Sequence, residues 1–341
     1  MASKTILVTG GTGFIAGWCI VQLLREGHTV RTTVRDLARE PGLRRSIASQ
    51  VDPGDRLSIV AADLTSDSGW DAAVAGCQHV LHIASPLGRG APSDRDALIV
   101  PARDGTLRVL KAAVAAGVER VVMTSAAATA RERGSRAIST ETIWADPSDP
   151  LLDPYRRSKI LAERAAWDFI QRPGGKTSLT TILPGAVFGP ILPSGDPASV
   201  WVIGGLLQGR PPRLLNLGLS VVDVRDLAAA HVAALTVPQA PGERFLATGT
   251  FLWMPDIARI LRGGLGRAGA KVPTRVLPNG LVRLLAVFMP QLRMFRHDLG
   301  QKREADDGKA RRLLGFSPRP VEQTLLDCAR SLVETPRPIP A

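Results

Sequence analysis

A tyrosine and a lysine four residues apart form the first pattern in this chain with catalytic potential. Tyr155 is the only tyrosine among the 341 residues, and Lys159 follows it within a segment predicted to be helical. Residues four apart on a helix project from the same face, so the phenol and the ammonium can serve one pocket. The ammonium would favour the phenolate and lower the pKa of the phenol from its usual value of about 10. The pair predicts a proton donor; an exposed tyrosine beside a solvated lysine is the alternative interpretation.

A glycine-rich run near the N-terminus predicts a site for a dinucleotide. Residues 9–16 are Thr-Gly-Gly-Thr-Gly-Phe-Ile-Ala, which holds the overlapping fingerprints Gly10-x-x-Gly13-x-x-Ala16 and Gly11-x-Gly13-x-x-Ala16. Small residues there let the backbone approach a pyrophosphate, whose charge meets the N-terminus of the following helix. The run follows an apolar segment and opens a helix, as the fingerprint requires, so a merely structural turn is the less favoured alternative.

The residues after the second predicted strand bear on which dinucleotide binds. Residues 33–36 are Thr-Val-Arg-Asp. Arg35 suits the 2′-phosphate of NADP, whereas an acid suits the free ribose of NAD, so we expect NADP and keep NAD as the less favoured alternative because of Asp36. Four residues at the ends of the next two strands are expected to lie against the adenine or beneath the cofactor: Asp63, Leu64, Ala84 and Ser85.

Apolar segments alternate with helices through the first half of the chain. Strands are predicted at 5–8, 28–34, 57–61, 79–84, 120–124 and 178–183. Short, continuously apolar runs separated by helices are typical of parallel strands buried on both faces. Right-handed crossovers then give an α/β fold with a doubly wound parallel sheet. The helix that carries Tyr155 is predicted to open at Asp153-Pro154, an N-cap followed by a first-turn proline.

The regular alternation of predicted strands and helices ends at Pro184, after which prolines and glycines become frequent. Helices are predicted at about 198–208, 226–236, 255–265 and 308–314, separated by short strands. We therefore predict a dinucleotide-binding domain over 1–184 with strand and helix contributions from about 219–236. A smaller mixed α/β substrate-binding lobe is expected over 185–335, capping the carboxyl edge of the sheet, with a flexible tail at 336–341.

Composition narrows the class of protein. The chain is 45% hydrophobic and 22% charged, which allows a sizeable core. The N-terminus lacks the pattern of a signal peptide, and the longest apolar stretches are too short to span a membrane. Three widely separated cysteines (Cys19, Cys77 and Cys328) argue for a reducing compartment and against a disulfide frame or a metal site. We expect a cytoplasmic globular protein.

The formal charge of +12 is unevenly distributed. Residues 259–303 contain ten lysines and arginines but only one acid, Asp298. This stretch could be a solvated arginine-rich surface, or it could attract an anionic substrate or an acidic membrane surface. Nucleic acid is the less favoured partner, because no recognition module or interleaving of aromatic and basic residues accompanies the charge.

Motifs along nearly the whole chain resemble those of the extended short-chain dehydrogenases/reductases, within the NAD-dependent epimerase/dehydratase superfamily. The similarity is greatest to the branch of dihydroflavonol reductases and bacterial aldehyde reductases. The segments that carry it are 9–15, 33–36, 62–64, 82–86, 105–110, 155–163, 184–190, 221–226 and 310–316. The resemblance implies a Rossmann-type domain, a small-molecule carbonyl substrate, and a monomer or homodimer.

The resemblance also implies roles for residues. Tyr155 becomes the general acid of an NADP(H)-dependent reduction of an aldehyde or ketone, and Lys159 holds the nicotinamide ribose while lowering the pKa of the phenol. Together with those two, the expected cofactor contacts are Gly10, Gly13, Phe14, Ile15, Arg35, Asp63, Leu64, Ala84, Ser85, Pro184 and Val187. Leu87, Phe188 and Trp201 are expected to line a mostly apolar pocket for a hydrophobic or aromatic carbonyl compound.

One position departs from the family pattern. The family's catalytic serine would fall at Ala126, within the run Thr-Ser-Ala-Ala-Ala-Thr at 124–129. Losing one such donor to the carbonyl costs about 10²–10³ in rate in other enzymes. Ser125 or Thr129 could reach the carbonyl instead, Tyr155 could act alone and slowly, or the alanine could be an introduced change. Ser125 is accordingly a candidate catalytic residue.

Other activities remain open at this point. The same site could oxidise a 3β-hydroxysteroid, or serve a nucleotide-sugar epimerase or dehydratase. Ala126 also motivates an alternative of another class, a dinucleotide-binding sensor with weakened catalysis. The intact pair of Tyr155 and Lys159 argues against that sensor.

Overall fold

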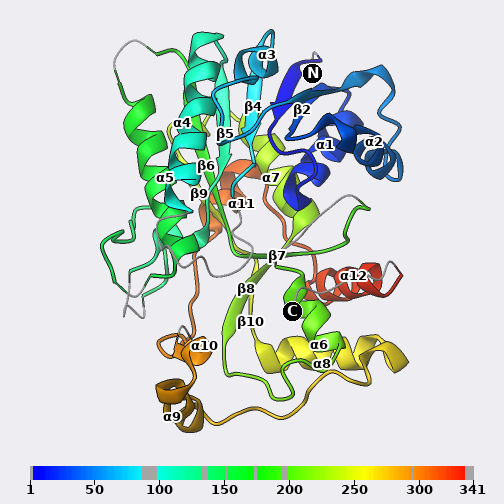
Figure 1. The fold of residues 1–341 in the computed structure, drawn as a ribbon, viewed down its shortest axis with the longest axis vertical. Coiled ribbons are helices and arrows are strands. Elements are labelled where there is room, and N and C mark those ends of the chain that lie inside the picture. The colour runs from blue at the N-terminus through cyan, green and yellow to red at the C-terminus, as the bar shows by residue number, and fades with distance from the viewer. Residues whose placement is uncertain are drawn as a thin grey trace.

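A seven-stranded parallel sheet forms the centre of the larger lobe (Figure 1), with the strand order β3-β2-β1-β4-β5-β6-β9. The computed structural model describes residues 3–86, 98–132, 137–150, 152–172, 175–193, 199–293 and 295–334. The strands of the large sheet are β1 (Thr5–Val8), β2 (Thr29–Val34), β3 (Leu57–Ala61), β4 (His79–His82), β5 (Arg120–Thr124), β6 (Ser178–Pro184) and β9 (Arg244–Ala247). The predicted doubly wound sheet is confirmed.

Helices cover both faces of this sheet. α1 and α7 pack together on one face, and α4 and α5 pack together on the other (Figure 1). Two apolar cores result, one for each face. The helices of this lobe are α1 (Phe14–Arg25), α2 (Glu40–Ala48), α3 (Trp70–Val74), α4 (Ile99–Ala115), α5 (Pro154–Ile170) and α7 (Val224–Thr236). Short 3-10 turns lie at η1 (Leu37–Arg39), η2 (Gly54–Arg56) and η3 (Ala127–Ala130).

The smaller lobe is built on a second sheet with the strand order β10-β8-β7. Its strands are β7 (Ala186–Phe188), β8 (Gly218–Asp223) and β10 (Thr250–Trp253). Its helices and 3-10 turn are α6 (Trp201–Leu207), α8 (Met254–Gly264), η4 (Gly266–Gly269), α9 (Asn279–Phe288), α10 (Pro290–Arg293) and α12 (Val321–Glu334). α11 (Gly308–Leu314) instead packs against β9 and α7 of the larger lobe. One detail of the predicted boundary is corrected: α7 does join the large lobe, but the later strand that joins the large sheet is β9, because β8 pairs within the small sheet.

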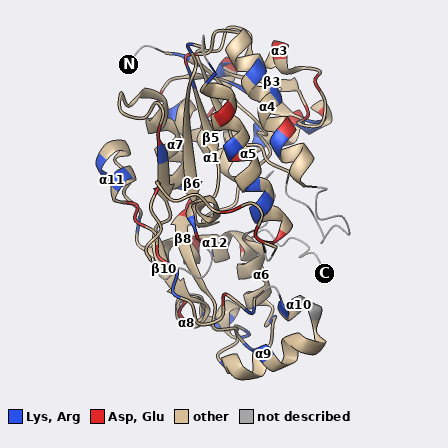
Figure 2. Cartoon of the chain, turned by 90° about the vertical axis from the view of Figure 1, so that its left-hand side faces the viewer, with Lys and Arg blue, Asp and Glu red and all other residues tan. Residues whose placement is uncertain are grey.

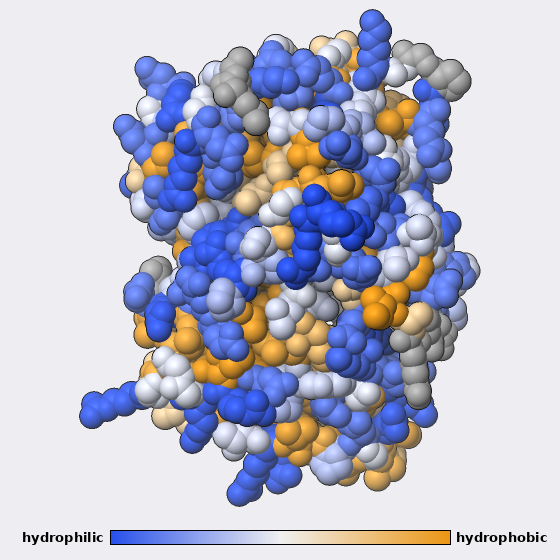
Figure 3. Space-filling model, turned by 180° about the vertical axis from the view of Figure 1, so that it is seen from behind, coloured by the Kyte–Doolittle hydropathy of each residue, from blue (hydrophilic) through white to orange (hydrophobic). Residues whose placement is uncertain are grey.

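The sequence pattern did not predict α9, whose exposed face is apolar. Val282 and Ala286 of α9 are buried, whereas Leu284 and Phe288 are 59% and 77% exposed. Hydrophobic side chains reach the surface toward this end of the molecule (Figure 3). Lysines and arginines lie on both lobes (Figure 2). Within the described part of the chain, no helix is long and apolar enough to cross a bilayer.

Candidate active site

The glycine run forms a tight turn between β1 and α1. Gly10 has a φ of +72°, and a Cβ added to it would lie 2.9 Å from the Cβ of Ala84. A Cβ on Gly11 would overlap the side chain of Thr32. The hydroxyl of Thr9 accepts hydrogen bonds of 3.0 Å from the backbone N–H groups of Ile83 and Ala84, which tie the end of β4 to this turn. Gly13 is the N-cap residue of α1, and no side chain caps it, so the helix N-terminus is available to an anion.

The two charged residues that follow β2, Arg35 and Asp36, differ in their surroundings. Arg35 is exposed, and its charge helps to hold down the pKa of Asp63, which is lowered mainly by a hydrogen bond from the backbone of Thr65. Asp36 caps the following turn, because its Oδ1 accepts a hydrogen bond of 2.9 Å from the N–H of Ala38. Asp36 is therefore engaged locally, whereas Arg35 is exposed at the end of β2.

The remaining expected cofactor contacts lie near the carboxyl edge of the sheet. Phe14 and Ile15 begin α1. The others follow or end neighbouring strands: Leu64 after β3, Ala84 and Ser85 after β4, Pro184 at the end of β6 and Val187 in β7. The chain thus supplies a glycine turn, a free helix N-terminus, an exposed arginine and a buried lysine along one edge, and this donor set fits an anionic dinucleotide.

Tyr155 and Lys159 occupy the first two turns of α5. Asp153 is the N-cap residue of this helix and accepts a hydrogen bond of 2.9 Å from the N–H of Arg156, as the sequence predicted. Lys159 is 4% exposed, and its Nζ donates a hydrogen bond of 3.1 Å to the carbonyl oxygen of Thr124, at the end of β5. The phenol of Tyr155, which is 37% exposed, makes no hydrogen bond to any residue that the structure describes.

The protonation of this pair differs from the sequence prediction. Burial lowers the pKa of Lys159 to about 8, against an opposing effect of Glu163. Although part of Tyr155 is exposed, the surrounding protein desolvates its hydroxyl, and with the charge of Asp153 this raises the pKa of the phenol to about 12. The prediction that Lys159 lowers the pKa of Tyr155 is therefore wrong in this structure. A phenol that stays protonated is still suited to donating a proton.

Ser125 lies in a buried network rather than at an open surface. It is 2% exposed, and its Oγ donates a hydrogen bond of 2.6 Å to Oε2 of Glu163. Glu163 is fully buried, and its other oxygen accepts from Thr181 at 2.8 Å and from the Nε of Arg244 at 2.9 Å. To polarise a substrate carbonyl, Ser125 would first have to leave a charge-assisted hydrogen bond.

Thr129 belongs to the same network. Its Oγ1 donates to the carbonyl oxygen of Ala126 at 2.9 Å and accepts from Nη2 of Arg244 at 3.0 Å. Arg244 also lies 3.7 Å from the centre of the Trp144 ring. Both hydroxyls that could replace the serine missing at position 126 are thus engaged with partners inside the protein.

The network also shows what the sequence analysis missed. Glu163 lies four residues after Lys159 on the same face of α5, and this spacing was the available signal for it. Arg244 lies on β9, 81 residues away from Glu163 in sequence, and no local sequence pattern indicated that the two would pair.

Among the residues expected around the substrate, Phe188 is 0% exposed and belongs to the apolar core, so it is not a pocket residue. Trp201 is half-buried at the start of α6, and Leu87 lies outside the described residues.

Known proteins with similar sequences identify the family of this chain. The family model described as "NAD dependent epimerase/dehydratase family" matches residues 6–247. Anthocyanidin reductase ((2S)-flavan-3-ol-forming) of Vitis vinifera is 31% identical over 278 residues, covering 76% of this chain and 81% of that protein. Cinnamoyl-CoA reductase 1 of Petunia hybrida is 34% identical over 268 residues, covering 76% of this chain and 77% of that protein.

Solved structures agree with the sequence matches. Gre2 from Candida albicans, in a complex with NADPH, is 30% identical and covers 98% of this chain and 100% of that chain, with a TM-score of 0.81. The fold, the motifs and these matches lead to one conclusion. The chain belongs to the NAD-dependent epimerase/dehydratase family and is an oxidoreductase of the extended short-chain dehydrogenase/reductase type.

Proposed function

We propose that this protein reduces an aldehyde or ketone to an alcohol with NADPH, using Tyr155 as the general acid. The observation that carries the proposal is that Tyr155 begins α5 four residues before the buried Lys159, whose Nζ reaches the carbonyl oxygen of Thr124 at the end of β5. The two curated relatives named above are reductases, and the Gre2 structure is an NADPH complex, which supports this direction and this cofactor.

Each residue has a defined task in this mechanism. NADPH, when bound, supplies the hydride. The N-terminus of α1 would hold the pyrophosphate, Arg35 the 2′-phosphate and Lys159 the nicotinamide ribose. The Oη of Tyr155 donates its proton to the carbonyl oxygen as negative charge develops there. The phenolate left after each turnover must regain a proton before the next one.

Replacing Arg35 with serine is expected to weaken NADPH binding about 10- to 100-fold while changing NADH binding little. The physical reason is that a guanidinium forms charge-assisted hydrogen bonds with a phosphate, which NADH lacks at the ribose. Dissociation constants for both cofactors are measured by fluorescence titration. Arg39→Ser is the control, since Arg39 is another exposed arginine in the following turn. An equal loss for NADPH and NADH would refute the phosphate contact.

Replacing Ala126 with serine is expected to raise kcat by about 10²–10³ with an accepted carbonyl substrate. Serine restores the donor that the family uses on the carbonyl oxygen, and neither Ser125 nor Thr129 supplies it here. NADPH oxidation is followed with a panel of aromatic and aliphatic aldehydes and ketones for both forms. A rate unchanged by the serine would mean that this chain polarises its substrate in another way.

The same assay separates the proposal from its alternative. Ala126 specifically favours a dinucleotide-binding sensor with weakened catalysis. If NADPH binds but neither the natural chain nor Ala126→Ser oxidises it with any carbonyl, the sensor is supported. Turnover in the natural chain supports the reductase.

A further inference from the structure

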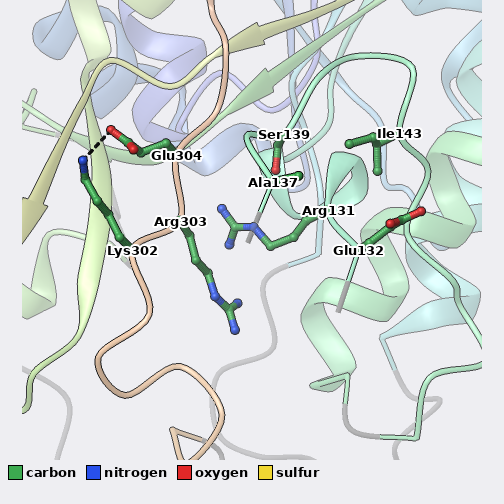
Figure 4. Close-up of a pocket in the computed structure, with 8 residues that line it drawn as sticks. All are labelled: Arg131, Glu132, Ala137, Ser139, Ile143, Lys302, Arg303 and Glu304. Carbon is green, nitrogen blue, oxygen red and sulfur yellow. Dashed lines mark ion pairs between the residues drawn. The ribbon is translucent and has the colours of Figure 1, made fainter. Parts of the chain in front are cut away.

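A pocket between two segments that are distant in sequence is lined by an arginine from each of them (Figure 4). It forms where the chain after β5 meets the chain before α11, which are joined by a parallel bridge between Ser139 and Ala305. The lining residues are Arg131, Glu132, Ala137, Ser139, Ile143, Lys302, Arg303 and Glu304. The guanidinium groups of Arg131 and Arg303 approach the same opening from its two sides (Figure 4).

Most charges around this pocket are matched by a partner. Lys302 pairs with Glu304 at 2.8 Å, and Arg303 pairs with Asp298. Arg156 of α5 pairs with Asp153 at 3.1 Å and also reaches Asp298 at 3.3 Å. The positive charges of Lys302, Arg303 and Arg156 are therefore each paired with a carboxylate of the protein.

Arg131 is the exception. No hydrogen bond or ion pair joins its guanidinium to a residue within the described ranges, although the side chain is half-buried. The carboxylate of the neighbouring Glu132 points away from the opening (Figure 4). Desolvation lowers the pKa of Arg131 to about 10; the charges of Arg303 and Arg156 act in the same direction, and the charge of Asp298 opposes them only in part. A partly desolvated cation among like charges is unfavourable unless an anion completes the site.

Arg131 and Arg156 both lie close in sequence to residues of the candidate active site. Arg131 directly follows η3, whose N-cap residue is Ala126, the position of the family's catalytic serine. On the other side, Arg156 is the residue after Tyr155, and Asp153, its ion-pair partner, also raises the pKa of the Tyr155 phenol. The arginines and the proton donor therefore belong to the same end of the sheet.

We propose that Arg131, assisted by Arg303, binds a carboxylate of the substrate, so that the reduced molecule is a carbonyl compound that also carries a carboxylate. The inference rests on the proposed reductase function and names its substrate class. Asp153 and Asp298 are the partners of Arg156 and Arg303, which leaves Arg131 without a carboxylate partner among the described residues. One unmatched charge suits a monoanionic carboxylate better than a dianionic phosphate, and a planar guanidinium matches the carboxylate with two parallel hydrogen bonds.

The test compares two aldehydes with the same reacting group, 4-carboxybenzaldehyde and its neutral methyl ester. We expect the natural chain to favour the acid in kcat/KM, and Arg131→Gln to lower the ratio of acid to ester about 10- to 100-fold. Arg131→Lys, which keeps the charge but not the planar group, is expected to restore part of the ratio. Arg259→Gln removes the same charge from a side chain that is 75% exposed and paired with Asp256, and should leave the ratio unchanged.

A binding measurement keeps this inference separate from the reductase proposal. Calorimetric titration of benzoate into the NADP⁺-loaded protein needs no turnover, and benzoate should bind the natural chain at least about 10-fold more tightly than Arg131→Gln. If no carbonyl is reduced but this difference is found, the reductase proposal fails and the carboxylate site stands. Equal benzoate affinities, an unchanged ratio of acid to ester, or tighter binding of inorganic phosphate than of benzoate would overturn the carboxylate assignment. Thermal unfolding serves as the folding control, and Arg131→Gln should not be less stable, because no partner is lost.

Discussion

Tyr155→Phe is expected to lower kcat for carbonyl reduction by about 10²–10⁴ while NADPH still binds. The change removes only the hydroxyl that would protonate the developing alkoxide, and a positioned general acid contributes a factor of this size. Initial rates of NADPH oxidation measure the loss, and fluorescence titration of NADPH is the control for an intact cofactor site. Unchanged turnover would show that the proton comes from another group.

The pH dependence of the natural enzyme tests the same assignment. The phenol of Tyr155, with its pKa raised to about 12, stays protonated across the usual assay range. Lys159, with its pKa lowered to about 8, loses its charge as the pH rises through that value. The reduction rate is therefore expected to fall above about pH 8, because the ribose-binding cation disappears while the acid remains. Lys159→Arg should move this limb to higher pH, and a rate that is flat to pH 10 in the natural enzyme would contradict the role of Lys159.

Glu163→Ala is expected to lower the free energy of unfolding by about 3–5 kcal/mol. Glu163 is 0% exposed and receives hydrogen bonds from Ser125, Thr181 and Arg244, so its removal leaves the Arg244 guanidinium buried without its carboxylate. Unfolding in urea, followed by circular dichroism, measures the loss. The Ser125 hydroxyl is freed at the same time, so the variant is also the one in which Ser125 could turn toward a substrate.

Two further variants make this stability prediction specific. Glu40→Ala is the matched control, because Glu40 pairs with Arg44 at 2.8 Å but both side chains are more than one third exposed, and exposed pairs contribute less than about 1 kcal/mol. Combining Glu163→Ala with Arg244→Met should be less damaging than the sum of the two single changes, since no lone buried charge remains. If Glu163→Ala is no more destabilising than Glu40→Ala, the buried ion pair is not what holds β5, β9 and α5 together.

The comparison of sequence and structure separates local signals from tertiary ones. The six predicted strands of the large sheet are confirmed, because each carries apolar or β-branched residues that favour a buried strand and are visible in the chain itself. The N-cap at Asp153 and the glycine turn at Gly10 are local in the same sense, since neighbouring residues satisfy them. The seventh strand, β9, was missed because it joins the sheet only after the chain has passed through the other lobe, so no local pattern assigns it to this sheet.

The sequence by itself determined which groups could do chemistry and on which elements they lie: Tyr155 and Lys159 on one helix face, Arg35 at a strand end, and an alanine at position 126. Only the tertiary structure decided what state those groups are in. Ser125 is held by Glu163, the pKa of Tyr155 is raised, and Arg131 lies among the charges of Arg156 and Arg303. The physical reason is that spacing along the chain fixes the direction of a side chain, whereas protonation and hydrogen bonding depend on burial and on partners that come from distant segments.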